Sequence, residues 1–357
     1  MTDNSNKVGI PPDYTERLAE TWEMLLGIGH ATAILPNRNR SQPKTPFTMV
    51  SGFLGAGKTT LLNALLSEPH GRRLAVLVND FGSINIDASL LRRRSADTIS
   101  LSNGCVCCSL ATGLTKTLVD LLQREERPEA IILEASGVAE PHGVVQIALS
   151  NPQLSLNGIV TVVDADAIFF QSENASVRMT IDRQIAAADI VILNKTDLAA
   201  SDGVERLRRH VAKTAPAART LETTYGCVPA EIILGPSQNR SHLRAEDVSG
   251  AAHRATYESI TFTTDKALDE TKICRLAESL PKGVLRAKGL IRLDTDDRHQ
   301  AILQVAGRRW NLEKGLSGDE SSRSELIVIG LKGQFDPVEL RAAFEACIAA
   351  ALTKARL

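Results

Sequence analysis

The sequence predicts an α/β fold with a mostly parallel sheet covered by helices on both faces, followed by a smaller α+β domain. Between Phe47 and about Gly226, short apolar runs without polar alternation are separated by helical stretches. Such runs are typical of parallel strands that are buried on both faces. A polar, turn-forming segment then runs from Gly235 to Arg254. The strands and two helical patterns that follow it predict the second domain.

Each element of the first domain is expected from its local pattern. Strands are predicted where β-branched and aliphatic residues run without interruption, and helices where apolar positions recur at helical spacing. The expected strands are Phe47–Ser51, Leu74–Val78, Ala130–Leu133, Ile159–Val163 and Ile190–Leu193, with helices such as Thr59–Leu66 and Leu114–Arg124 between them.

The second domain is expected to close with a well-marked helix. Asp336 can cap that helix, Pro337 suits its first turn, and Glu339 completes a capping box. The elements expected before it are an alternating strand over Tyr257–Phe262, a helix over Asp269–Leu280, and strands over Leu285–Leu293, Ala301–Val305 and Leu326–Ile329.

The expected domain boundaries follow from these patterns. Residues 1–45 form an extension and linker with a helical pattern at Asp13–Leu26, and residues 46–235 form the α/β domain. Residues 236–254 form a second linker, and residues 255–357 form the α+β domain.

The composition is that of an ordinary globular protein. The chain has 357 residues, of which 43% are hydrophobic, and its 41 Lys and Arg against 42 Asp and Glu give a net charge of -1. This balance gives no general attraction to nucleic acid or to a membrane surface, so neither is expected as a partner. No apolar run resembles a secretory signal or a membrane span, and we expect a cytoplasmic protein.

The segment Gly52–Thr59 matches the phosphate-binding pattern GxxxxGK[ST], directly after an apolar strand and before a helix. Backbone N–H groups of such a loop surround a β-phosphate, aided by the positive end of the helix. Lys58 is expected to reach the β- and γ-phosphates, and the Thr59 hydroxyl to bind Mg²⁺. The expected phosphate-binding residues are Gly52, Gly55, Ala56, Gly57, Lys58, Thr59 and Thr60.

A second motif, Asn194-Lys195-Thr196-Asp197, follows the predicted strand Ile190–Leu193. Ligands of open α/β sheets bind at this carboxyl edge. In P-loop GTPases the Asp of NKxD accepts hydrogen bonds from guanine, and adenine offers the reverse polarity. Together with the phosphate loop, the motif predicts GTP rather than ATP as the nucleotide, bound through Asn194, Lys195 and Asp197.

Two further segments carry candidate chemistry. Glu134 lies just beyond a predicted buried strand, where a P-loop enzyme keeps the residue that governs Mg²⁺ or the attacking water, and Gly137 allows backbone to approach the γ-phosphate. Cys105, Cys107 and Cys108 form a CxCC cluster, whose thiolates can converge on one tetrahedral ion. Thiolates favour Zn²⁺ or Cu⁺ and accept Co²⁺ or Ni²⁺. A structural metal or a redox pair remains an alternative for the cluster.

The motifs together resemble those of the CobW-type metallochaperone GTPases, a branch of the P-loop GTPases. The resemblance runs from about Phe47 to the C-terminus. The matching segments are SGFLGAGKTTLLNALL (Ser51–Leu66), NDFG (Asn79–Gly82), NGCVCC (Asn103–Cys108), ILEASGVAEP (Ile132–Pro141), VVDA (Val162–Ala165), NKTD (Asn194–Asp197), RAKG (Arg286–Gly289) and IGLKGQFDPVEL (Ile329–Leu340).

The resemblance implies GTP hydrolysis coupled to metal binding at the cysteines and to transfer of that metal to a client metalloprotein or a metal-cofactor pathway enzyme. By position it makes Lys58, Glu134 and Asp80 the catalytic candidates, although many members carry Glu where this chain has Asp80. Zn²⁺ is the default metal, with Co²⁺ or Ni²⁺ as alternatives. His142 is left out of the ligand set, because a lone histidine is usually a surface or packing residue.

Two other functions remain open at this stage. In one, the metal is permanent and structural, and GTP controls docking on a target metalloenzyme that the protein activates. In the other, the phosphate loop serves a small-molecule kinase, although no acceptor pocket is recognisable in the sequence.

Overall fold

The structure, a computed structural model, describes residues 44–68, 70–78, 97–100, 108–236, 256–307, 309–317 and 323–349. The chain divides into Met1–Gln42 and a compact unit over Pro43–Leu357. The helix expected at Asp13–Leu26 therefore lies outside the described residues. Within the described ranges, no helix is long and apolar enough to cross a membrane.

The first domain is built on a seven-stranded sheet whose strands are all parallel. The strand order is β3-β2-β4-β1-β5-β6-β7. The chain moves from β1 outward to β3, returns to β4, and then continues on the other side of β1, so the order reverses at β1. Ligands of open α/β sheets bind at such a reversal. The strands are β1 (Thr45–Ser51), β2 (Leu74–Val78), β3 (Asp97–Ser100), β4 (Ala130–Glu134), β5 (Leu154–Asp164), β6 (Ile190–Asn194) and β7 (Arg219–Glu222).

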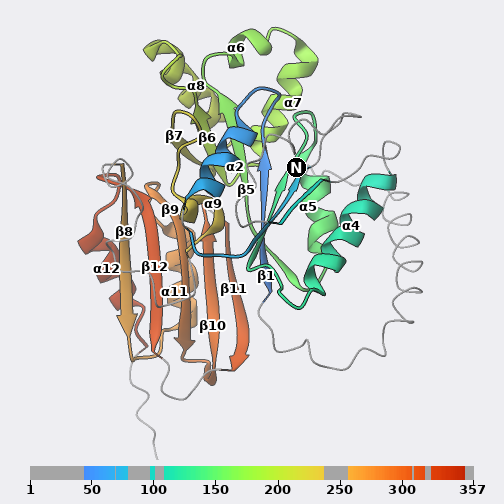
Figure 1. Ribbon diagram of the computed structural model, residues 1–357. Coiled ribbons are helices and arrows are strands. Elements are labelled where there is room, and N and C mark those ends of the chain that lie inside the picture. The colour runs from blue at the N-terminus through green and yellow to red at the C-terminus, as the bar shows by residue number, and fades with distance from the viewer. Residues whose placement is uncertain are drawn as a thin grey trace, which may run out of the picture. The chain divides into compact units, whose positions relative to one another are not determined.

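Helices cover both faces of this sheet, because its strands are apolar on both sides. One face packs against α2 (Lys58–Ser67) and α9 (Ala230–Leu234). The other packs against α4 (Cys108–Leu122) and α5 (Pro141–Leu149), and, beyond β5, against α7 (Ala175–Ala186) and α8 (Ser201–Thr214). Figure 1 shows α4 and α5 on the opposite side of the sheet from α2. The short helix α6 (Ile168–Gln171) follows β5.

The second domain is an antiparallel five-stranded sheet with two helices. Its order is β11-β10-β9-β12-β8. One face packs against both helices around a core in which the rings of Phe262 and Phe344 stack at 5.5 Å. Asp336 caps the last helix through the N–H of Val338, at 2.7 Å, as expected. The elements are β8 (Tyr257–Thr264), α11 (Glu270–Ser279), β9 (Val284–Leu293), β10 (Asp296–Ala306), β11 (Arg309–Ser317), β12 (Ser324–Leu331) and α12 (Pro337–Ala346).

The observed architecture confirms the predicted fold class. Some boundaries differ: the helix expected from Leu114 begins at Cys108, and β4 extends through Glu134. Three strands were not predicted from the sequence, namely β3, β7 and β11. Two of them have only four residues, and all three are rich in polar residues, because they lie at the edges of their sheets.

A buried arginine joins the two domains. Arg286, on β9, is 1% exposed, and its guanidinium donates to the carbonyls of Ile232 at 2.8 Å, Ile233 at 3.3 Å and Asn157. Asn157 is an extra residue on β5, since Phe47 pairs with Leu156 and Thr48 with Gly158. This bulge turns a strand carbonyl toward the second domain.

A second arginine makes the reverse connection. Arg219, on β7, donates to the carbonyls of Val284, at 3.0 Å, and Leu280, at 3.1 Å. Arg309 adds hydrogen bonds to the Asp189 carboxylate at 3.0 and 3.1 Å. Backbone carbonyls therefore satisfy the buried guanidinium groups of Arg286 and Arg219, and the exposed Arg309 pairs with the buried carboxylate of Asp189.

Candidate functional site

The loop after β1 has a backbone that only glycines adopt without strain. Gly52, Gly55 and Gly57 have φ values of 138°, 79° and 100°. A Cβ on Gly52 would lie 2.2 Å from the carbonyl oxygen of Val162, and one on Gly57 would lie 2.3 Å from Nδ2 of Asn194. The positive φ values and the close neighbours both require glycine here. Within the loop, the N–H of Ala56 donates to the carbonyl of Phe53 at 3.2 Å.

Lys58 and Thr59 begin helix α2 at the mouth of this loop. Lys58 is 8% exposed, and its Nζ donates to the carbonyls of Gly52, at 2.9 Å, and Phe53, at 3.3 Å. No side chain caps the helix, so its first N–H groups face the loop. A buried ammonium and a helix N-terminus together attract an anion. Thr59 Oγ1 donates to Glu134 Oε1 at 3.1 Å.

Glu134 is the last residue of β4 and is 2% exposed. Its register partners are Val50 on β1 and Val78 on β2, so its strand ends beside the phosphate loop. The following loop is pressed against that loop, because a Cβ on Gly137 would lie 2.8 Å from the nitrogen of Leu54. No acceptor in the described part of the chain pairs with the N–H groups of Ser136, Gly137 and Val138. These donors are available to a ligand.

Asn194 connects three segments of the site. Its Nδ2 donates to the carbonyl of Ala56 in the phosphate loop at 3.0 Å, and its Oδ1 accepts from the N–H of Gly226 at 2.9 Å. Lys195 has a φ of 62°, and its Nζ lies 2.6 Å from Asp164 at the end of β5. Asp197 is exposed. The carboxylate is thus free to meet a ligand, whereas Asn194 holds the loops together.

The loop 223–227 was missed in the sequence. It follows β7, and Thr223 Oγ1 donates to the carbonyl of Cys227 at 2.6 Å. A Cβ on Gly226 would lie 2.7 Å from Cα of Leu61 on α2. Tyr225 has a φ of 53° and is 75% exposed. The available signal was Gly226 shortly after a strand, but this signal could not be used because the short polar strand β7 was itself not predicted.

Two of the three expected cysteine ligands, Cys105 and Cys107, lie outside the described residues, whereas Cys108 is the first residue of α4. Asp80, a predicted catalytic residue, also lies outside them. Among the described residues, no group of three or more His, Cys, Asp or Glu side chains is arranged to hold a metal ion. Strands β2 and β3 run parallel and end at Val78 and Ser100, on the same sheet edge as the phosphate loop.

Two cations lie on β9, where it meets α9: Arg286 is buried, and Lys288 is partly buried. Burial lowers the pKa of Arg286 to about 10, although the Asp189 carboxylate acts in the opposite direction. Burial, and then the charges of Arg72 and Arg286, lower the pKa of Lys288 to about 8. Both shifts have the sign expected when a cation loses water. Both cations lose water because the second sheet and α9 pack around them, so their desolvation costs free energy when the two domains pack together.

A phosphate loop between β1 and α2, with NKTD at the end of β6 on the same sheet edge, defines a P-loop GTPase. The chain belongs to the CobW/HypB/UreG family. The model of the CobW/HypB/UreG nucleotide-binding domain matches residues 46–222, and that of the cobalamin synthesis protein cobW C-terminal domain matches residues 257–348.

Characterised relatives cover most of the chain. The zinc chaperone CobW of Sinorhizobium sp is 31% identical over 352 residues, which cover 86% of this chain and 98% of the relative. The zinc chaperone YjiA of Escherichia coli (strain K12) is 29% identical and covers 83% of this chain and 96% of its own length. The zinc-regulated GTPase metalloprotein activator 1 of Schizosaccharomyces pombe is 35% identical over 203 residues, 54% of this chain and 49% of that protein.

Proposed function

We propose that the protein is a GTP-hydrolysing metallochaperone of the cytoplasm. It binds a transition metal at Cys105, Cys107 and Cys108 and passes it to a client metalloprotein or to an enzyme of a metal-cofactor pathway. One observation carries this proposal. The phosphate loop, Glu134 and the NKTD motif lie at the sheet edge where β2 and β3 also end, and the strand end at Ser100 precedes the cysteines in the chain.

At the phosphate end, Lys58 exchanges its carbonyl acceptors for β- and γ-phosphate oxygens. The carbonyl contacts at 2.9 and 3.3 Å show that its ammonium already lies over the loop. Mg²⁺, when bound, neutralises the charge that develops on the phosphates during hydrolysis. The hydroxyl of Thr59 and the carboxylate of Glu134, 3.1 Å apart, are oxygen donors of the kind that this ion prefers.

Hydrolysis requires a water molecule aligned with the γ-phosphorus. Its oxygen forms the new bond to phosphorus as the bond to the β,γ-bridging oxygen breaks. GDP leaves with the bridging oxygen, and the phosphoryl group leaves as inorganic phosphate, which keeps the oxygen and the protons of the water. The N–H groups of Ser136 and Gly137 contact the γ-phosphate, and Asp80 and Glu134 are the acids that govern the water. GDP lacks the group that these N–H donors contact.

At the other end, Asp197 reads the base. Its carboxylate accepts from the ring N–H and the amino group of guanine, while Asn194 keeps the phosphate loop and the loop 223–227 in contact through its bonds at 3.0 and 2.9 Å. Zn²⁺ is the proposed cargo, with Co²⁺ or Ni²⁺ as alternatives, because thiolates suit all three ions. The relatives named zinc chaperones support Zn²⁺.

The test is a competitive metal titration of the reduced protein with a chromophoric chelator. It is run without nucleotide, with Mg²⁺-GDP and with a Mg²⁺-bound nonhydrolysable GTP analogue, for the wild type and for Cys107→Ser. The proposal predicts that one ion binds more tightly in the GTP-analogue state and that Cys107→Ser loses this site. By linkage, the ion must then tighten GTP-analogue binding by the same factor.

Equal metal affinity in the three states would instead favour the second function, in which the metal is structural and GTP controls docking on a target metalloenzyme. The similarity to a protein named a metalloprotein activator supports this alternative. Chelation distinguishes the two functions, because removal of a structural ion lowers the thermal stability of the protein.

A further inference from the structure

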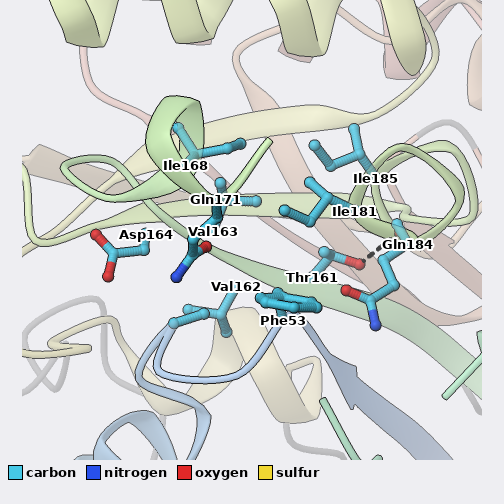
Figure 2. Close-up of a pocket in the computed structure, with 11 residues that line it drawn as sticks. Phe53, Thr161, Val162, Val163, Asp164, Ile168, Gln171, Ile181, Gln184 and Ile185 are labelled. Carbon is cyan, nitrogen blue, oxygen red and sulfur yellow. Dashed lines mark hydrogen bonds between the residues drawn. The ribbon is translucent and has the colours of Figure 1, made fainter. Parts of the chain in front are cut away.

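Gln184, on helix α7, is a buried polar side chain beside the phosphate loop. It is 1% exposed, and its Nε2 donates to the carbonyls of Gly137, at 2.9 Å, and Ala139, at 3.2 Å. Its own backbone carbonyl accepts from Thr161 Oγ1 at 2.9 Å. Figure 2 shows Gln184 and Thr161 joined by this bond at one end of a pocket that Phe53 of the phosphate loop also lines.

The two carbonyls fix the orientation of this amide. Both partners of the side chain are acceptors, so the nitrogen faces them and each of its two hydrogens is used. Carbonyls buried without donors are costly. The loop after β4 is therefore held to α7 at two points by one side chain.

The hold on the carbonyls also orients the N–H groups of the loop. In a trans peptide the carbonyl and the next N–H point in opposite directions. Because the Gly137 carbonyl points to Gln184, the N–H of Val138 points away from α7. The opposite side of the loop meets the phosphate loop, where a Cβ on Gly137 would lie 2.8 Å from the Leu54 nitrogen. Gly137 is thus confined between α7 and the phosphate loop.

Gln184 is also tied to the strand that carries the phosphate loop. Thr161, whose hydroxyl donates to the Gln184 carbonyl, pairs in register with Ser51, the last residue of β1. Thr161 is itself only 1% exposed. Gln184 therefore connects the loop 135–139 to β5, the strand that pairs with the end of β1.

We propose that Gln184 is a positioning residue for the γ-phosphate side of the nucleotide site. It holds the loop 135–139 so that the N–H groups of residues 136–138 meet the third phosphate, and it has no contact with GDP. The inference rests on the proposed GTPase function and adds a residue to it.

The test compares Gln184→Met with Gln171→Met. Methionine keeps the length of glutamine but donates no hydrogen bond. Gln171 lines the same pocket, and no bond of its side chain to a described residue is present. We expect Gln184→Met to lower kcat for GTP hydrolysis by about tenfold or more and to lower the affinity for the GTP analogue by a similar factor. The reason is the loss of the two hydrogen bonds that hold the loop. Affinity for GDP should stay within about twofold, and Gln171→Met should behave as the wild type.

The outcomes separate the inference from the function on which it rests. If the wild type binds no GTP, the proposed function fails before the variant is considered. The positioning role is wrong if the wild type hydrolyses GTP and Gln184→Met has the same kcat. It is also wrong if Gln184→Met loses affinity for GDP and for the GTP analogue by the same factor.

A measurement on the wild type alone covers the case in which Gln184→Met does not fold. Hydrogen exchange of the amides of residues 136–138 should slow with the GTP analogue and not with GDP. Equal exchange in the two states would overturn the inference.

Discussion

The guanidinium of Arg286, on the second sheet, donates to the carbonyl of Asn157, an extra residue in a strand of the first sheet. Gly158, next in the chain, has a φ of 148°, and a Cβ there would lie 3.1 Å from the Arg286 guanidinium. The bulge at Asn157 supplies the carbonyl that Arg286 binds, and Gly158, which has no Cβ, leaves room for the guanidinium. Both domains thus contribute to a contact that neither makes alone.

Arg286→Met should destabilise the protein strongly. The carbonyls of Ile232 and Asn157 lose a buried donor, and we expect a loss of about 3 kcal/mol in the free energy of unfolding. Arg292 lies on the same strand, and its guanidinium makes an exposed hydrogen bond to the backbone carbonyl of Asp265. Arg292→Met should therefore lower the free energy of unfolding by less than about 1 kcal/mol. Urea unfolding measures both. Equal midpoints for the two variants would contradict this role of Arg286.

Lys288→Met should stabilise the protein at neutral pH. Because the pKa of Lys288 is lowered from 10.5 to about 8, the folded state holds its proton less firmly than the unfolded state. The destabilisation is complete below pH 8 and is relieved as the pH rises toward 10.5. The variant should therefore gain up to about 3 kcal/mol at pH 7, and the gain should vanish near the upper pH.

Lys282→Met is the matched control, since Lys282 is exposed just before β9. Tyr257, whose pKa burial raises to about 12, also contributes to the pH dependence of stability at high pH. Its contribution is the same in both variants and cancels in the comparison. Chemical denaturation at several pH values provides the comparison. A gain for Lys288→Met that does not change with pH would show that its charge is not the cause.

Gly57→Ala should weaken the binding of both GTP and GDP. The new Cβ would lie 2.3 Å from Nδ2 of Asn194, at a φ of 100°, and would disturb the bond from that amide to Ala56. We expect a loss of at least tenfold, or about 1.4 kcal/mol, in nucleotide affinity. Gly71→Ala has a φ of 65° but meets no atom within 4 Å, so it controls for backbone strain. Calorimetry distinguishes them, and similar affinities would refute the prediction.

Asp197→Asn should change which base is bound. An amide oxygen and amino group replace two carboxylate acceptors, so guanine loses one acceptor, whereas xanthine, with a carbonyl in place of the amino group, gains a donor. We expect the ratio of GTP to XTP affinity to fall by about tenfold or more. Asp202→Asn, in the first turn of α8, should leave the ratio unchanged. An unchanged ratio in Asp197→Asn would place base recognition elsewhere.

The sequence predicted the features whose information is local. The phosphate loop needs glycines at fixed spacing, and the strand before it is an apolar run, so both are evident within Phe47–Thr59. Strand β7 was not predicted because Arg219–Glu222 has only four residues, three of them polar, and the loop 223–227 was missed with it.

Long-range contacts were beyond the reach of a local pattern. The bond from Asn194 to Ala56 spans 138 residues, and that from Gln184 to Gly137 spans 47. Gln184 lies in the polar segment ASVRMTIDRQIA, whose composition predicts an exposed helix surface. Only the folded arrangement shows that its amide is buried against another loop.

The strand order also sets the spacing of the site. Adjacent strands lie about 4.8 Å apart, so β3 ends about 14 Å along the sheet from β1 on one side, and β6 about 10 Å away on the other. The NKTD motif, at the end of β6, and the end of β3 thus lie on opposite sides of the phosphate loop, with β4 and Glu134 between β3 and that loop. Under the proposed function, recognition of the base beside β6 and of the third phosphate beside β4 are therefore separate events, and only the second takes place on the side of the sheet where β2 and β3 end.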